Sequence, residues 1–146
     1  MTRRPSGERV VRPQLVDTSA WIEWFRDTGS LAAQMVGELR ADPHRVAVTQ
    51  PIALEVRAGA ARRRLPVVNR VLDDAVQLDV VPHLDFDVAA ELFRACRDAG
   101  RPVRSLMDCL IAAVAVRTGA VLLHQDRDYD TLAAVAPDLR VLSGLR

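Results

Sequence analysis

The sequence predicts an α/β fold in three layers, α/β/α, with a short central parallel sheet flanked by helices. The first observation is composition: 49% of the residues are hydrophobic but only 4% are aromatic, so the core has to be built from alanine, valine and leucine. Alanine and leucine favour helices, whereas the valine clusters favour strands. The second observation is that strand-like and helix-like segments alternate along the chain, which is typical of a parallel sheet covered on both faces.

A chain of 146 residues fits one domain with one core. We expect the folded domain over residues 14–146, after a disordered basic tail over residues 1–13. The tail is rich in arginine, proline and glycine and lacks the apolar stretch of a secretory signal. Two interpretations of the tail stay open: contact with RNA, or an upstream translation start without a role.

The strands and helices are predicted in the following order. The strands are residues 14–17, 45–49, 78–81, 120–124 and 138–142. The helices are residues 20–26, 30–42, 51 toward 62–64, 66–77, 85–99 and 105–118. Residues 17–19 are all N-cap types, Pro51 suits a first helical turn, and Pro82 is expected to close the third strand. The helix over 105–118 is the best defined, because a capping box opens it at Ser105 and Gly119 follows its end.

Composition also excludes several classes of protein. The formal net charge of +1 neither requires nor excludes a nucleic-acid partner. All 20 basic residues are arginine. Without lysine, the chain cannot form a Walker A nucleotide-binding loop, a receiver domain or a haloacid-dehalogenase-type phosphatase. A serine hydrolase is not expected either, because the GxSxG motif is absent.

The two cysteines, Cys96 and Cys109, form no CxxC pair, so neither a disulfide framework nor a zinc site is expected. Free thiols suit a reducing compartment. No apolar run reaches the roughly 20 residues that span a bilayer. We therefore expect a cytoplasmic protein with no membrane partner.

Acidic side chains stand near the carboxyl ends of the predicted strands. Asp17 ends the first strand, Glu55 lies early in the helix after the second strand, and Asp126 and Asp128 follow the strand over 120–124. Sites in parallel sheets gather at the carboxyl ends of the strands. We expect these acids to converge there, joined by Asp108 from the first turn of the helix over 105–118.

Each acid also has a purely structural interpretation. Asp17 and Asp108 suit helix capping, Glu55 suits a solvated helix face, and Asp126 and Asp128 suit a turn. However, the sequence around Asp108 and Glu55 is apolar, where an unpaired carboxylate is costly. No lysine exists to neutralise these acids, and the three histidines are scattered. The set therefore predicts a hard cation, Mg²⁺ or Mn²⁺, acting on a phosphate ester.

Four segments resemble, in order and spacing, the acidic segments of PIN-domain ribonucleases, in particular the VapC-type toxins of type II toxin–antitoxin systems. The segments are LVDTSAWI at 15–22, PIALEVRAG at 51–59, LMDCLIAA at 106–113 and LLHQDRDY at 122–129. The resemblance covers residues 14 to about 143. It implies a PIN-like fold, Mg²⁺- or Mn²⁺-dependent cleavage of RNA phosphodiester bonds, a homodimer, and inhibition by a cognate VapB-like antitoxin.

The resemblance also assigns roles to residues. It makes Asp17 and Asp108 the principal metal ligands and Glu55 the third acid. Thr18 or Ser19 is then expected to orient Asp17 by hydrogen bonding.

The fourth catalytic acid is Asp128, Asp126 or both, and the number of ions stays open between one and two. Asp128 precedes an aromatic residue, as the family pattern requires. That residue is Tyr129 here, where phenylalanine is more common.

Arginines are expected to bind the phosphates of the RNA strand, because the guanidinium group matches phosphate geometry. Arg104 and Arg127 are the candidates, and the run at 62–64 either binds RNA or simply ends a helix. Trp21 and Trp24 either pack in the core or line a groove for an antitoxin helix. Two alternatives to the toxin remain: an RNA-processing nuclease of the same fold without an antitoxin, and an inactive binding module.

Overall fold

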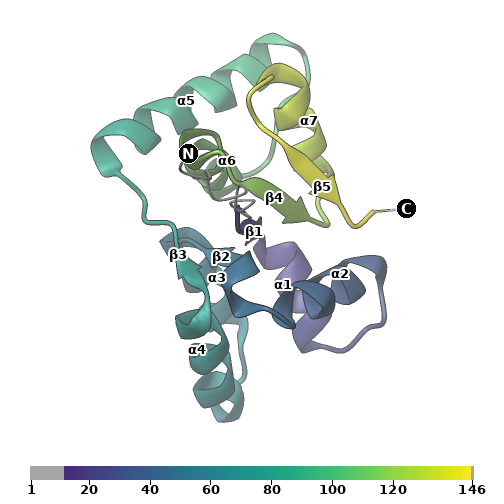
Figure 1. Cartoon of the computed structure of the whole chain (residues 1–146). Coiled ribbons are helices and arrows are strands. Elements are labelled where there is room, and N and C mark those ends of the chain that lie inside the picture. The colour runs from purple at the N-terminus through teal and green to yellow at the C-terminus, as the bar shows by residue number, and fades with distance from the viewer. Residues whose placement is uncertain (1–11, 146) are drawn as a thin grey trace, which may run out of the picture.

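The computed structural model describes residues 12–145, so most of the predicted tail lies outside the described residues. Over that range, five short strands form one parallel sheet in the order β3-β2-β1-β4-β5 (Figure 1). The strands are β1 (Gln14–Val16), β2 (Val46–Val48), β3 (Val76–Gln77), β4 (Val121–His124) and β5 (Val141–Ser143). The central strand β1 pairs with β2 on one side and with β4 on the other.

Helices cover both faces of this sheet. One face carries α1 (Thr18–Phe25), α2 (Leu31–Arg40), α3 (Gln50–Gly59) and α4 (Leu65–Asp74); the other carries α5 (Pro82–Asp98), α6 (Leu106–Thr118) and α7 (Arg127–Val135) (Figure 1). Right-handed crossovers explain this division, because the chain moves outward from β1 to β3 and then returns to β4 and β5. The predicted three-layer α/β/α fold is confirmed.

Helix α6 is enclosed more completely than any other helix described. Every residue from Asp108 to Ala115 is buried, since α5, α7 and β4 surround the helix. Its ends agree with the sequence: Ser105 caps the first turn through the amide of Asp108, and Gly119 ends the helix with a left-handed φ of 70°. The enclosure of α6 carries the carboxylate of Asp108 into the interior.

Several predicted elements differ from the structure, among them the last strand, which was predicted over residues 138–142 and lies at Val141–Ser143. The third strand is at Val76–Gln77 rather than at residues 78–81, and the helix before it ends at Asp74. Pro82 does not close a strand; it begins α5. The residue before a proline is held extended, as Val81 is with φ −103° and ψ 98°, so the segment had the local pattern of a strand without a sheet partner.

Helix α3 ends at Gly59, and residues 62–64 form a separate 3₁₀ turn, η2, so the arginine run does not extend α3. A second 3₁₀ turn, η1, spans Pro43–Arg45. Helix α7 was not predicted, because Asp126, its N-cap, has the sequence pattern of a turn. Among the residues described, no helix is both long and apolar enough to cross a membrane.

Candidate active site

The acidic side chains gather at the topological switch point of the sheet, between β1 and β4. The chain leaves β1 into α1 on one face, whereas it leaves the neighbouring strand β4 into α7 on the other face. A crevice forms at such a point, beyond the carboxyl ends of the strands. Asp17 follows β1 directly, and Asp126 follows β4 by two residues.

Asp17 is buried and fixed by hydrogen bonds at both of its carboxylate oxygens. Its Oδ2 accepts from the backbone amide of Ser19 (2.9 Å) and from the Ser19 hydroxyl (2.6 Å). Its Oδ1 accepts from the hydroxyl of Tyr129 at 2.7 Å. The Ser19 hydroxyl also accepts from the amide of Gln125, so this one serine joins the loops that follow β1 and β4.

Asp108 is 8% exposed and enters the crevice from the first turn of α6. The pKa of its carboxyl group is raised from 3.8 to about 7, mainly by burial and in addition by the negative charges of Asp17, Asp126 and Glu55. A hydrogen bond from Tyr129, whose hydroxyl lies 3.3 Å from Asp108 Oδ1, opposes this shift. Asp17, Asp126 and Glu55 therefore lie close enough to Asp108 for their charges to affect its ionisation.

Glu55 reaches the same crevice from α3. Its Oε1 accepts a hydrogen bond from the hydroxyl of Thr18 at 3.0 Å, so Thr18 contacts Glu55 and only Ser19 contacts Asp17. Burial raises the pKa of Glu55, and the nearby charge of Asp17 adds to this effect.

Asp126 and Asp128 lie at the outer rim and differ in their partners. Asp126 Oδ1 caps α7 through the amide of Asp128 (2.9 Å), and its charge acts on Asp108. Asp128 Oδ2 accepts from the backbone amide of Arg104 (3.1 Å) and forms an ion pair with its guanidinium group (3.4 Å). The charge of Asp128 raises the pKa of two thiols, Cys96 and Cys109, in which burial is the larger cause. Arg104 also pairs with Asp126, at 3.7 Å, so the two rim acids share this arginine and only Asp128 acts on the thiols.

Sequence reasoning treated Tyr129 as a minor departure and His124 as a structural residue. Both are fully buried, and their rings are in contact, with centroids 5.2 Å apart. His124 Nδ1 accepts from the amide of Asp126, and its Nε2 lies 3.3 Å from a carboxylate oxygen of Asp130. No local sequence signal pointed to the role of Tyr129, because the two acids that its hydroxyl contacts lie 112 and 21 residues away along the chain.

The donor set at the crevice fits a hard divalent cation. Asp108, Asp126 and Asp128 offer carboxylate oxygens that all lie within 4.8 Å of one another, and Tyr129 links Asp17 to Asp108. Oxygen ligands of this kind suit Mg²⁺ or Mn²⁺. Among the residues described, the only cationic side chain paired with these acids is Arg104, which is bound at the outer rim.

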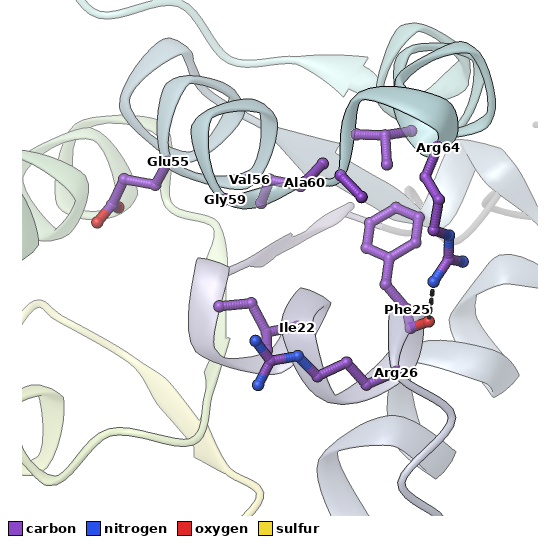
Figure 2. Close-up of a pocket in the computed structure, with 10 residues that line it drawn as sticks. Ile22, Phe25, Arg26, Glu55, Val56, Gly59, Ala60 and Arg64 are labelled. Carbon is purple, nitrogen blue, oxygen red and sulfur yellow. Dashed lines mark hydrogen bonds between the residues drawn. The ribbon is translucent and has the colours of Figure 1, made fainter.

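A second feature adjoins the acids. A pocket of about 290 Å³ lies between α1, α3 and the η2–α4 segment, lined mainly by apolar side chains that include Ile22, Phe25 and Val56 (Figure 2). Arg64 closes one side by donating to the carbonyl oxygen of Phe25 at 2.9 Å. Glu55 lies at one end of the pocket, with its carboxylate turned away from Phe25 (Figure 2). The pocket therefore leads to the acidic crevice.

The tryptophans of α1 pack in the interior and do not line this pocket. Trp21 is fully buried and stacks on Phe25, with ring centroids 5.7 Å apart. Trp24 packs edge-on against both rings and lies beneath the guanidinium group of Arg40. Their neighbours Ile22 and Phe25 supply the pocket wall instead.

Comparison with known proteins identifies the family. Residues 15–135 match the PIN domain. VapC ribonuclease Mb1587 of Mycobacterium bovis and ribonuclease VapC11 of Mycobacterium tuberculosis are each 44% identical to this chain over 123 residues, which are 83% of this chain and 92% of each relative.

Solved structures agree with this fold. A DNA-bound VapBC from Salmonella typhimurium superposes with a TM-score of 0.70 at 17% identity, covering 91% of this chain and 98% of that one. VapBC-5 from Mycobacterium tuberculosis superposes with a TM-score of 0.62 at 26% identity, covering 90% and 98%. The chain belongs to the PIN-domain family and, within it, to the VapC ribonucleases.

Proposed function

We propose that this protein is a divalent-metal-dependent endoribonuclease, the toxin of a VapBC-type pair. The observation that carries the proposal is the convergence of Asp17, Glu55 and Asp108 from three separate segments, with no arginine among them in the described residues. Asp17 and Asp108 are buried and Glu55 is half-buried, so without a counter-ion the three carboxylates repel one another, and a cation relieves that repulsion. The proposal puts the protein in the cytoplasm, where a cellular RNA substrate is found.

In this proposal, Asp17 and Asp108 hold the ion, with Glu55 and Asp126 completing the set. Asp126 is preferred to Asp128 as the fourth acid, because the charge of Asp126 raises the pKa of Asp108. Arg104 pairs with both acids, but it binds Asp128 through its backbone amide as well as its guanidinium group, whereas its contact with Asp126 is a single ion pair at 3.7 Å. When bound, Mg²⁺ or Mn²⁺ lowers the pKa of an adjacent water molecule and stabilises charge on the phosphate. Ser19 keeps Asp17 in position by two hydrogen bonds.

Exposed arginines beside the crevice are suited to hold the strand. Arg127 follows the acidic rim directly and, with Arg101, lines a surface cavity next to α7. Arg104 is 81% exposed despite its ion pairs with the rim acids, so it is free to exchange an aspartate for a phosphate. These residues bind phosphate groups and carry no base preference.

The test is RNA cleavage by the purified chain, free of any antitoxin, with Mg²⁺, with Mn²⁺ and with EDTA. Asp17→Asn and Asp108→Asn are expected to lose roughly 100-fold or more, since even outer-shell partners of metal ligands cost 10–100-fold. Asp73→Asn is the matched control, because Asp73 is 73% exposed on α4. Intact RNA with both metals across a broad panel, or full activity in Asp17→Asn, would contradict the proposal.

The proposal includes an antitoxin segment that occupies the pocket beside Glu55. An apolar pocket that ends at a catalytic acid lets one bound segment both anchor and block the site. Ala61→Trp, at an exposed position of the pocket lining, is expected to weaken inhibition by the antitoxin and leave cleavage unchanged. Ala90→Trp, at an exposed position on α5, is the control. Equal inhibition of both variants would argue against this pocket.

We extend the proposal to a homodimer. Leu84 and Phe86 on α5 are 48% and 57% exposed and supply apolar surface away from the pocket. Sedimentation velocity gives the oligomeric state directly, and a monomer at micromolar concentration would count against this extension.

A further inference from the structure

The hydroxyl of Tyr129 lies between the two carboxylates that the proposed function makes the principal metal ligands. Tyr129 is the one tyrosine of the chain and is fully buried. Its hydroxyl is 2.7 Å from Asp17 Oδ1 and 3.3 Å from Asp108 Oδ1. A phenol in the interior needs a hydrogen-bond partner, and here both available partners are acids of the active site.

The ring that carries this hydroxyl is fixed from two sides. Asp126 caps α7 and sets the start of the helix, so Tyr129 points inward from the first turn. His124 packs against the ring on the side of β4. A phenol is protonated at neutral pH, so the hydroxyl that faces the two carboxylates acts as a hydrogen-bond donor.

The donors around Asp17 leave little choice of where an ion can bind it. Each carboxylate oxygen has two acceptor positions. Oδ2 of Asp17 is already used by the amide and the hydroxyl of Ser19, so the open position is on Oδ1, beside the Tyr129 hydroxyl. The same hydroxyl faces Oδ1 of Asp108.

We propose that the Tyr129 hydroxyl is a positioning group that holds Asp17 and Asp108 in the arrangement that binds the divalent cation. The inference rests on the proposed metal-dependent function and assigns the cation affinity of this chain partly to α7. Tyr129 acts through the two aspartates and does not touch the substrate. Without the hydroxyl, the two carboxylates face an apolar ring edge, and their mutual repulsion turns them apart.

Tyr129→Phe tests this inference, because it removes the hydroxyl and keeps the ring. Titration calorimetry of the metal-free protein with Mg²⁺ and Mn²⁺, without RNA, is expected to show affinity about 10-fold weaker, at the lower end of the 10–100-fold range for groups that orient metal ligands. Thr118→Val is the matched control, since Thr118 also donates one hydroxyl hydrogen bond, to Val114 at 2.7 Å, away from the site. Affinity in Tyr129→Phe within twofold of the native protein would overturn the inference.

Cleavage kinetics separate positioning from a general structural role. A positioning role raises the metal concentration for half-maximal rate and leaves the rate at saturating metal within a few-fold of native. Loss of folded protein lowers the saturating rate and leaves the half-maximal metal concentration unchanged, and that pattern contradicts the inference.

A second measurement avoids any folding defect. Because the chain has one tyrosine, growth on 3-fluorotyrosine labels Tyr129 alone and keeps its hydroxyl. The ¹⁹F resonance is expected to shift on addition of Mg²⁺, with the affinity found by calorimetry; a resonance that Mg²⁺ saturation leaves unmoved would overturn the inference. If the native protein binds neither metal, the proposed function itself fails, which is a different result from equal binding by native and variant proteins.

Discussion

Two buried aspartates lie at opposite ends of α6 and have opposite surroundings. Asp108 is in its first turn, and Asp85 pairs with Arg117 in its last turn. Asp85 is 1% exposed, and both of its oxygens accept from the Arg117 guanidinium group at 2.9 Å. Burial alone would raise the pKa of Asp85, but the hydrogen bonds from Arg117 and from the amide of Val81 lower it below its usual value.

At the other end of the helix, Asp108 has three acids nearby and no arginine on its own oxygens in the described part of the chain. A buried carboxylate is costly unless it is paired. The fold pairs Asp85 internally, and this end of α6 is purely structural. It leaves Asp108 to be neutralised by a proton or by a cation, which is what a site for an external ion requires.

The largest expected effect on stability comes from breaking the Asp85–Arg117 ion pair. Arg117→Ala leaves Asp85 buried without a partner and is expected to lower the free energy of unfolding by about 3–5 kcal/mol, the usual cost of breaking a buried pair. Urea denaturation measures this change. Arg57→Ala is the control, because the Arg57–Asp73 pair is exposed and contributes about 1 kcal/mol or less. Equal losses in the two variants would show that Asp85 is not the buried partner described here.

In the first turn of α6, Asp108→Asn is expected to stabilise the metal-free protein at pH 8 by between about 1 and 4 kcal/mol, since each pKa unit corresponds to about 1.4 kcal/mol. The pKa of Asp108 is raised from 3.8 to about 7 in the folded protein, so the folded state keeps a proton that the unfolded chain has released. The free energy of unfolding therefore falls as the pH rises from about 4 to about 7. Denaturation with EDTA at pH 5 and pH 8 measures this slope, and Asp108→Asn should flatten it. If the free energy of unfolding still falls with pH in Asp108→Asn, a group other than Asp108 causes the pH dependence.

The affinity for Mg²⁺ is expected to rise with pH as Asp108 loses its proton, whereas the stability of the metal-free protein falls. A cation has to displace the proton of Asp108, so affinity rises by up to about tenfold per pH unit below pH 7 and levels off above it. Calorimetry in two buffers of different ionisation enthalpy measures the proton released on binding. Constant affinity between pH 5.5 and pH 7.5 would mean that Asp108 is already ionised without metal.

The local sequence predicted α6 well because its signals were strong and agreed: a capping serine, an apolar run and a terminal glycine. The local sequence placed β3 at residues 78–81 instead of 76–77, because this two-residue edge strand is defined by its pairing with β2 and not by its own sequence pattern. Asp126 shows the same limit, because a capping aspartate before α7 and a turn aspartate have the same sequence pattern.

For the site, the sequence predicted convergence because parallel strands bring their carboxyl ends to one edge. It could not determine which hydroxyl contacts which acid. Thr18 and Ser19 are adjacent, yet α1 turns one toward Glu55 and the other toward Asp17. The hydrogen bonds of Tyr129 span 112 and 21 residues, so they arise only from the packing of α7 against β1 and α6.

The smallest expected effect concerns Arg104 at the outer rim. Arg104 pairs with Asp126 and Asp128 near the start of α6, as Arg117 pairs with Asp85 near its end, but its pairs are exposed. Arg104 is 81% exposed and lies 3.4–3.7 Å from the acids it pairs with, so solvent screens the interaction to about 1 kcal/mol or less. Arg104→Ala is therefore expected to raise Mg²⁺ affinity by no more than about fivefold, because one competing cation is removed. The backbone bond from residue 104 to Asp128 remains in this variant, so the loop before α6 stays attached to α7. Arg101→Ala, at an exposed position three residues earlier in the same loop, should leave Mg²⁺ affinity unchanged. A fall in affinity in Arg104→Ala would mean that the arginine orders Asp126 and Asp128 for the cation, and the contrast between the two ends of α6 would then lie in the inner acids alone.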